Sequence, residues 1–188
     1  MKKYQLIRKI DFLGRIVIPK QIRRSFRIVI GDPLEFFVNQ KGELILEKYS
    51  LVKGLGSLLA DIANPLHEAT GSIVIITDRD NTVFVAGASR EEYGQHPIGA
   101  GVDRVLASRT GVLENKPGTA LAAAILEDDE RKAQYSAVII EPILLPEMAV
   151  GALCLASREK GRSFGDLEVT LARFAATLLA KNISAYDE

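Results

Sequence analysis

Residues 11–24 read Asp-Phe-Leu-Gly-Arg-Ile-Val-Ile-Pro-Lys-Gln-Ile-Arg-Arg, and this stretch predicts the local fold of the N-terminal part of the chain. Its first four residues indicate a turn, because Asp favours turns and Gly14 can adopt a positive φ. The β-branched run at 15–18 predicts a strand that Pro19 stops. The same proline favours a helix start, so we expect one short helix over residues 20–26.

The flanking sequence completes a small β-rich unit. Residues 5–10 predict a strand before the turn, and residues 34–39 and 43–47 predict a hairpin across Gln-Lys-Gly. A unit of roughly 50 residues buries a low fraction of its surface, and neither a disulfide nor a metal supports it. We therefore expect residues 1–50 to fold only as a dimer, with intertwined strands.

Charge is distributed unevenly along the chain. The 188 residues hold 24 Lys+Arg and 24 Asp+Glu, but residues 1–50 are net +6 and residues 51–188 are net −6. Residues 1–27 hold nine basic side chains and one acid, Asp11. A cationic segment on an otherwise acidic protein favours a polyanionic partner such as nucleic acid, although a solvated basic surface gives the same pattern.

Composition excludes several classes of protein. At 47% hydrophobic and 26% charged residues, the chain is globular, and no apolar run reaches the ~18 residues of a membrane span. The N-terminus has no signal-peptide pattern, so we expect a cytoplasmic protein. One cysteine and two distant histidines, His67 and His96, predict no metal site and no cofactor.

The remainder of the chain predicts an α+β domain. Ser50 can cap a helix over residues 51–69, which Pro65 should kink or divide. Residues 111–134 are ambiguous, with an exposed charged run at 128–132. The other expected elements are strands at 72–77, 82–87, 135–142 and 149–157, a short helix capped by Ser89, and helices at 102–108 and from 166 onward. Helices and antiparallel strands in this order indicate a central sheet covered by helices.

Residues 7–35 resemble the AbrB-type transition-state regulators, through the string Asp11-x-Leu-Gly-Arg-Ile-Val-Ile-Pro-x-x-Ile-Arg-Arg24. The tail after residue 50 more loosely resembles the second domain of sporulation regulators of the stage V protein T type, a GAF-type sensor fold. The resemblance implies a two-domain protein, with an N-terminal β-rich swapped-hairpin dimeric barrel (1–50), a linking helix (51–70) and a C-terminal α+β GAF-like sensor or oligomerisation domain (71–188).

By the same resemblance, the side chains that contact DNA are Arg8, Lys9, Arg15, Arg23 and Arg24. The residue types suit the task, because the arginine fork can bridge phosphate oxygens or the O6 and N7 atoms of guanine. Neighbouring side chains on a helix point about 100° apart, so at most one of Arg23 and Arg24 can face a given groove.

Other polar residues favour structural roles. Asp11 can bond the turn backbone or orient an arginine, with the turn favoured. The Asp78/Asp80 pair predicts a polar strand turn rather than a metal site. Cys154 lies in an apolar strand and is predicted to be a core residue. Four polar residues could converge in a sensor pocket under residues 88–126, although surface placement is favoured for each: Ser89, Arg90, Tyr93 and Arg109.

The resulting hypothesis is a DNA-binding transcriptional regulator of sporulation or transition-state genes that is not an enzyme. Its expected partners are double-stranded DNA and further copies of itself, as a homodimer or homotetramer that pairs through helices 51–69 and 166–184. The C-terminal domain would bind a small-molecule ligand or serve only in assembly. Two alternatives remain open: an antitoxin-type DNA-binding autoregulator, and a GAF-type enzyme or ligand-binding protein with a basic arm.

Overall fold

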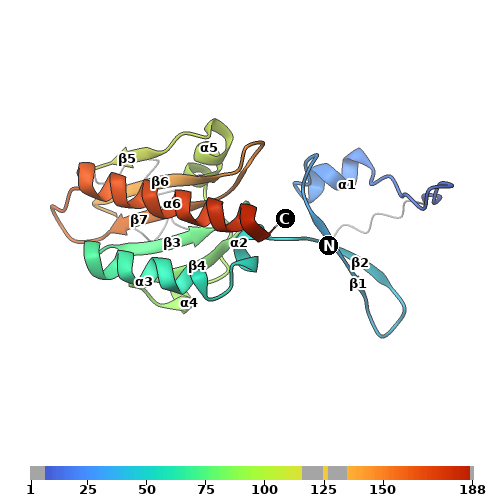
Figure 1. Cartoon of the computed structure of the whole chain (residues 1–188), viewed down its shortest axis with the longest axis horizontal. Helices are drawn as coiled ribbons and strands as arrows, with labels where there is room; N and C mark the ends of the chain where they lie inside the picture. The colour runs from blue at the N-terminus through green and yellow to red at the C-terminus, as the bar shows by residue number, and fades with distance from the viewer. Residues whose placement is uncertain (1–6, 116–124, 127–134, 187–188) are drawn as a thin grey trace. The chain divides into compact units, whose positions relative to one another are not determined.

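The computed structural model of the chain describes residues 7–115, 125–126 and 135–186. The chain divides into two compact units, Met1–Tyr49 and Ser50–Glu188 (Figure 1). The N-terminal unit contains a short helix and a hairpin, and the C-terminal unit contains a five-stranded sheet with helices.

The N-terminal unit is built around an antiparallel hairpin, as predicted. Strand β1 (Leu34–Val38) pairs with β2 (Leu44–Lys48), with Phe36 opposite Leu46. Asn39 closes the turn, because its backbone N–H donates to Glu43 O at 3.1 Å and its side-chain Oδ1 accepts two further backbone N–H groups. The predicted helix also forms, as α1 (Lys20–Ser25) after Pro19.

Strands were expected at 5–10 and 15–18. In this single chain, residues 7–10, the described part of the first range, and residues 15–18 do not form strands. The expectation was wrong for one chain, because a strand needs a neighbour to satisfy its backbone N–H and C=O groups. No residue of 7–49 is buried. Apolar side chains that face water include Phe12 at 93% exposure, Ile30 at 92% and Ile7 at 85%.

The C-terminal unit begins with two helices where one was expected. Ser50 caps α2 (Leu51–Gly54) by accepting the Lys53 N–H on its Oγ at 3.2 Å, and α3 (Leu58–Thr70) follows. The division was expected at Pro65, but this proline lies inside α3. The helix instead breaks around Gly56, whose φ of 55° is left-handed, because glycine has low helix propensity and tolerates that conformation.

Five antiparallel strands form one sheet in the order β4-β3-β7-β6-β5. They are β3 (Ile73–Thr77), β4 (Thr82–Ala86), β5 (Val112–Glu114), β6 (Ala137–Leu144) and β7 (Ala149–Ser157). All nine residues of β7 are buried, as its place at the centre of the sheet requires. Strand β5 lies within the segment whose sequence was ambiguous, and the charged run at 128–132 lies outside the described residues.

Helices cover both faces of this sheet, so the unit has two apolar cores. On one face, α3 and α6 (Asp166–Tyr186) pack against the sheet around Leu153 and Leu179 (Figure 1). On the other face, α4 (Arg90–Tyr93) and α5 (Ala100–Ser108) cover a core that contains Cys154, which is fully buried as predicted.

In the part of the chain that the structure describes, no helix is long and apolar enough to span a bilayer.

Candidate nucleic-acid interface

The turn at residues 11–15 fixes the direction of Arg15. The Asp11 backbone N–H donates to Arg15 O at 3.0 Å, and Asp11 Oδ1 accepts the N–H groups of Leu13 and Arg15 at 2.9 Å each. Gly14 takes a φ of 76°, which few other residues adopt. Asp11 therefore has the turn role that was favoured.

The same aspartate also holds the arginine side chain, so both roles weighed for it are present. Arg15 Nε donates to Asp11 Oδ2 at 2.8 Å, while the Arg15 side chain remains 68% exposed. Hydrogen bonds from the Arg15 backbone N–H and side chain lower the pKa of the Asp11 carboxyl. The guanidinium is thus anchored through one nitrogen, and its outer edge is available to an external phosphate or base.

Helix α1 presents the two neighbouring arginines differently. The Arg23 backbone N–H donates to Pro19 O at 3.0 Å, and Arg23 O accepts the Ile28 N–H at 2.8 Å. Arg23 is half-buried and Arg24 is exposed. The two side chains therefore differ in their exposure to a partner.

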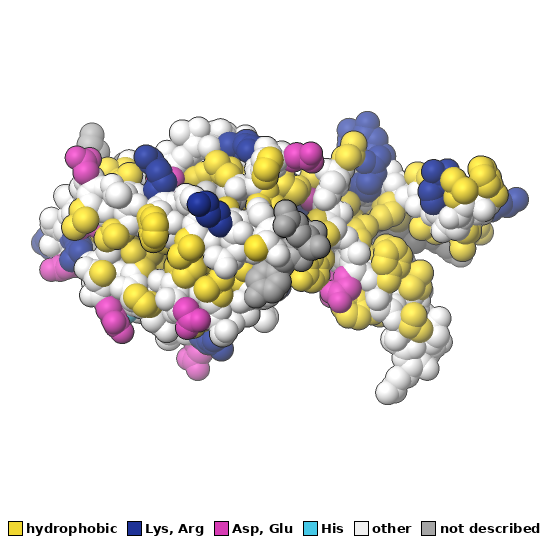
Figure 2. Space-filling view, viewed as in Figure 1, with side chains coloured by type: hydrophobic (Ala, Val, Ile, Leu, Met, Phe, Trp, Pro, Cys, Tyr) yellow, Lys and Arg dark blue, Asp and Glu magenta, His cyan; other side chains and the backbone are white. Residues whose placement is uncertain are grey.

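The remaining two predicted residues lie in the extended segment before the turn. Arg8 and Lys9 are both exposed, and Arg8 Nη1 donates to Ile7 O at 3.2 Å. The five predicted residues thus come from three segments of one unit: 7–10, the 11–15 turn and α1. Figure 2 shows Lys and Arg side chains gathered on this unit beside exposed hydrophobic ones.

An apolar groove of about 800 Å³ lies within the same unit. Its walls are mainly aliphatic and aromatic and include Ile16, Ile22, Phe26 and Leu46, and Arg8 also lines it. The groove joins the segment before the turn, α1 and β2, three parts of the unit that are distant in sequence. Sequence patterning indicated the apolar residues but not that they share one open groove.

The C-terminal unit holds a polar cluster that sequence reasoning found only in part. Tyr93 and Tyr135 are fully buried, and their hydroxyl oxygens lie 2.9 Å apart. The Arg158 guanidinium stacks 5.4 Å and 5.6 Å from the two ring centres and donates to Glu92 at 2.6 Å. This hydrogen bond raises the pKa of Arg158 further, so the guanidinium stays charged.

Of the four residues that could have converged in a sensor pocket, only Tyr93 joins this cluster. Ser89 caps α4 by accepting the Glu92 N–H, and Arg109 donates to Leu145 O and Pro146 O. Arg90 is exposed. No local signal in the sequence connects Tyr93 with Tyr135, because 42 residues separate them.

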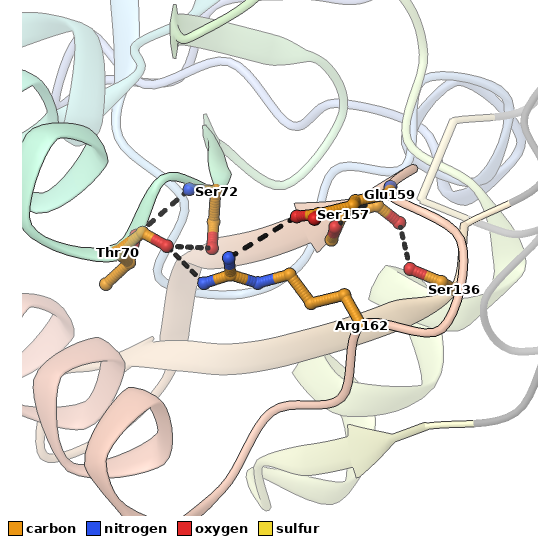
Figure 3. A network of polar contacts seen from close by, with 6 residues as sticks. All are labelled: Thr70, Ser72, Ser136, Ser157, Glu159 and Arg162. Carbon is orange, nitrogen blue, oxygen red and sulfur yellow. Dashed lines mark hydrogen bonds and ion pairs between the residues drawn. The ribbon is translucent and has the colours of Figure 1, made fainter.

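A second polar network ties the end of α3 to the loop after β7 (Figure 3). Arg162 Nη2 donates to Thr70 O, and its Nη1 lies 3.6 Å from Glu159 Oε2. Ser136 Oγ donates to Ser157 O at 3.1 Å. These contacts fix the loop between β7 and α6 against the start of the sheet, which is a structural role.

Comparison with known proteins decides the family. The model of the family described as stage V sporulation protein T C-terminal, transcription factor, matches residues 54–184. Stage V sporulation protein T of Bacillus subtilis is 34% identical over 183 residues, which cover 97% of this chain and 99% of the relative. The chain belongs to the stage V sporulation protein T family. The expected resemblance is therefore confirmed.

The N-terminal unit of this family member has its own relatives. The transition state regulatory protein AbrB of Bacillus subtilis is 45% identical over 49 residues, which are 26% of this chain and 50% of AbrB. The model of the antidote-toxin recognition MazE family of bacterial antitoxins matches residues 7–53. The AbrB-like nature of the N-terminal unit is thus confirmed.

Solved structures confirm the GAF-like fold of the C-terminal unit. A GAF domain/HD domain protein from Geobacter sulfurreducens has a TM-score of 0.54 at 16% identity, covering 74% of this chain and 99% of that one. A type II free methionine-R-sulfoxide reductase from Thermoplasma acidophilum has a TM-score of 0.55 at 13% identity, covering 72% and 96%. At such identities the likeness shows the fold alone.

Proposed function

We propose that this protein is a homo-oligomeric transcription regulator that binds double-stranded DNA through a surface made by two N-terminal units. The observation that carries the proposal is the N-terminal unit itself. It carries basic side chains at Arg8, Lys9, Arg15, Arg23 and Arg24, of which Arg23 is half-buried and the others are exposed, and no residue among 7–49 is buried. The relatives are a transcription factor and transition state regulators, which supports a regulatory rather than an enzymatic role.

Pairing of two units follows from the exposed apolar surface. A folded unit that leaves Ile7, Phe12 and Ile30 more than four-fifths exposed gains stability when a partner covers them. The groove of about 800 Å³ offers a place for the partner's segment. Residues 15–18 lack a strand neighbour in one chain, and the matching segment of a second copy would supply one. This is the swapped-hairpin arrangement expected from the sequence.

The basic residues suit a surface for the DNA backbone. Arg15 is anchored by Asp11 through one nitrogen, so its remaining donors are pre-oriented toward a partner at small entropic cost. Symmetry would place each of the five residues on the dimer twice. Phosphate contacts of this kind position a protein on the duplex, and base or shape contacts then supply specificity.

The C-terminal unit would assemble the regulator and sense a signal. Helix α6 exposes Leu167 at 69%, Phe174 at 66% and Leu178 at 36%, with half-buried Leu171 between them. Spacings of four, three and four residues place these side chains in one stripe, as in helices that pair with another helix. Hydrophobic side chains are visible along the face that α6 crosses (Figure 2). Pairing there, in addition to the N-terminal pairing, would give a homotetramer.

Sensing would need a ligand whose affinity differs between two states of the protein. The buried Tyr93–Tyr135 pair under Arg158 supplies polar groups on the sheet face that α4 and α5 cover. If no metabolite changes the affinity for DNA, the domain serves only in assembly.

DNA binding is tested by fluorescence anisotropy of a mixed-sequence duplex with the full-length protein at about 50 and 200 mM salt. Six or more phosphate contacts predict an affinity loss of about 10³-fold or more over that range. The Arg23→Ala/Arg24→Ala variant should bind more weakly and with a shallower salt dependence. A matched control is Arg104→Ala/Lys181→Ala, which removes two exposed cations of the C-terminal unit. A folded oligomer that fails to bind at low salt, or equal weakening by both double variants, refutes the proposal.

A further inference from the structure

One of the five basic residues of the candidate interface is held differently from the other four. Arg15 Nε donates to Asp11 Oδ2 at 2.8 Å, whereas none of the other four side chains is bonded to an acidic residue that the structure describes. A long basic side chain without such a partner samples many rotamers, and ordering it on a ligand costs entropy. Arg15 has therefore lost part of this freedom before DNA binds.

Asp11 is itself fixed, so a rigid group holds the arginine. Its Oδ1 accepts the backbone N–H groups of Leu13 and Arg15 at 2.9 Å each, and its own N–H donates to Arg15 O at 3.0 Å. The two carboxylate oxygens thus have separate tasks, because Oδ1 closes the turn and Oδ2 holds the guanidinium. A carboxylate that is bonded at both oxygens cannot rotate freely, which limits the directions that the guanidinium can take.

The donors that remain on Arg15 form a fork at the end of its side chain. Because Nε is bonded to Asp11, the N–H groups of Nη1 and Nη2 are left for an external partner. The Arg15 side chain is 68% exposed, so a ligand can reach these groups. Two neighbouring donors on an exposed side chain of fixed direction match a partner that offers two adjacent acceptors.

Guanine is the base that offers such a pair of acceptors. In the major groove it presents N7 and O6 together, whereas adenine presents one acceptor and one donor. Phosphate oxygens also accept a fork, but they repeat along the whole backbone, so a mobile cation can reach them without a fixed direction. The exposed Lys9 and Arg24 suit that task. A fixed arginine is of more use at a base edge, where a misdirected fork loses its second hydrogen bond.

The charge of Asp11 gives a second indication. Residues 1–27 hold nine basic side chains, and Asp11 is the one acid among them. A negative charge on a surface that binds a polyanion lowers the affinity for every duplex, whatever its sequence. Its direct bond to an arginine of that surface offsets this cost only if the direction of the arginine matters to binding.

On the basis of the DNA binding proposed above, we propose that Arg15 reads a guanine in the major groove and that Asp11 is the residue that positions it. Arg15 would donate from Nη1 and Nη2 to N7 and O6, while Asp11 keeps the guanidinium directed at the base edge. Two paired N-terminal units would present this fork twice. A preferred duplex should therefore carry two guanines related by a two-fold axis.

The experiment first uses the full-length protein to select preferred duplexes from a pool with a randomised centre. Fluorescence anisotropy at constant salt then compares a selected duplex with the same duplex in which 7-deazaguanine replaces guanine. The replacement removes the N7 acceptor and leaves the phosphates unchanged. We expect it to weaken binding at least about tenfold, because a bidentate base contact supplies discrimination of that order. Selected duplexes that share no guanine, or equal affinity for the two forms, overturn the proposal.

Three variants separate positioning from charge. Asp11→Asn keeps an acceptor for the turn but removes the carboxylate that holds Arg15 Nε. It should reduce the ratio of the two affinities to about threefold or less, while the affinity for the 7-deazaguanine duplex stays equal or rises because an acid is lost. Arg15→Lys keeps the charge without the fork and should also remove the preference. Glu43→Gln, the matched control, removes a carboxylate from the hairpin turn of the same unit and should leave the ratio unchanged.

The outcomes distinguish this role from a structural one and from DNA binding as such. A guanine preference that Asp11→Asn leaves intact, or that Glu43→Gln lowers equally, overturns the positioning role. Equal weakening toward both duplexes in Asp11→Asn, with a lower melting temperature, means that Asp11 only holds the turn and likewise overturns it. Steep salt dependence without a guanine preference would leave the regulator proposal standing, whereas absence of all DNA binding at low salt would overturn both.

Discussion

The substitution Phe36→Ala is the most direct test of pairing between N-terminal units. Phe36 lies in β1 opposite Leu46 and is 60% exposed in the single chain. In a monomeric unit, Phe36→Ala would change an exposed side chain and shift the free energy of unfolding by no more than about 0.5 kcal/mol. In a paired unit, the partner would cover the exposed part of the ring.

The size of the effect follows from the exposed area. A phenylalanine side chain presents roughly 200 Å². Covering the 60% that is exposed removes about 120 Å² from water, which at ~25 cal/mol per Å² is about 3 kcal/mol for each chain. That energy corresponds to roughly a 10²-fold change in an opening equilibrium.

The assay is hydrogen exchange detected by mass spectrometry on the full-length protein, read from peptides that cover residues 7–49. Phe36→Ala should accelerate exchange of the hairpin amides roughly 10²-fold. Phe174→Ala is the matched control, because Phe174 is a 66% exposed phenylalanine of α6, and it should leave exchange in 7–49 unchanged. Unaltered hairpin exchange in Phe36→Ala would refute the pairing argument.

Four other substitutions, one of them a control, examine the C-terminal unit. Gly151→Ala would place a methyl group 2.0 Å from a backbone carbonyl of β3, so it should lower the free energy of unfolding by more than about 3 kcal/mol, as measured by thermal unfolding. Gly165→Ala is the control and should be tolerated, because no atom lies closer than 3.8 Å to the added methyl group. Asn115→Ala removes two 2.8 Å hydrogen bonds to the Phe164 backbone and should cost about 2 kcal/mol in denaturant unfolding; an unchanged midpoint would contradict this. The hydrogen bond from the Gly165 backbone N–H lowers the pKa of the Glu168 carboxyl in the folded protein. The charged carboxylate therefore stabilises the fold at pH values above its pKa in the unfolded chain, and this stabilisation is lost as the pH falls through the pKa of the folded state. Glu168→Gln should therefore cost about 0.5 kcal/mol at pH 7 and nothing near pH 3, and an equal cost at both pH values would exclude the charge as its source.

The sequence predicted correctly those elements that depend on residues close together in the chain. The hairpin was predicted because two short apolar, strand-forming runs flank a turn, which Asn39 closes by hydrogen bonds to its backbone. The cap by Ser89 and the buried position of Cys154 also followed from their immediate neighbours. The helix break was misplaced because two signals competed, and the left-handed Gly56 outweighed Pro65.

Features that depend on distant partners could not be predicted from the sequence. Residues 15–18 have strand propensity but no neighbour in their own chain, so the pattern alone could not decide their structure. The Tyr93–Tyr135 contact and the stacking of Arg158 arise from the folded sheet rather than from spacing.

The strand order has a consequence for the time course of folding. The last strand to be synthesised, β7, lies at the centre of the sheet between β3 and β6. Until it is made, β3–β4 and β5–β6 can form only two separate antiparallel pairs, and each pair leaves an unpaired edge open to other chains. Pairing of Val74 with Leu155 closes a long loop, which slows folding. A chain truncated before β7 should therefore aggregate, because its two half-sheets lack the strand that joins them.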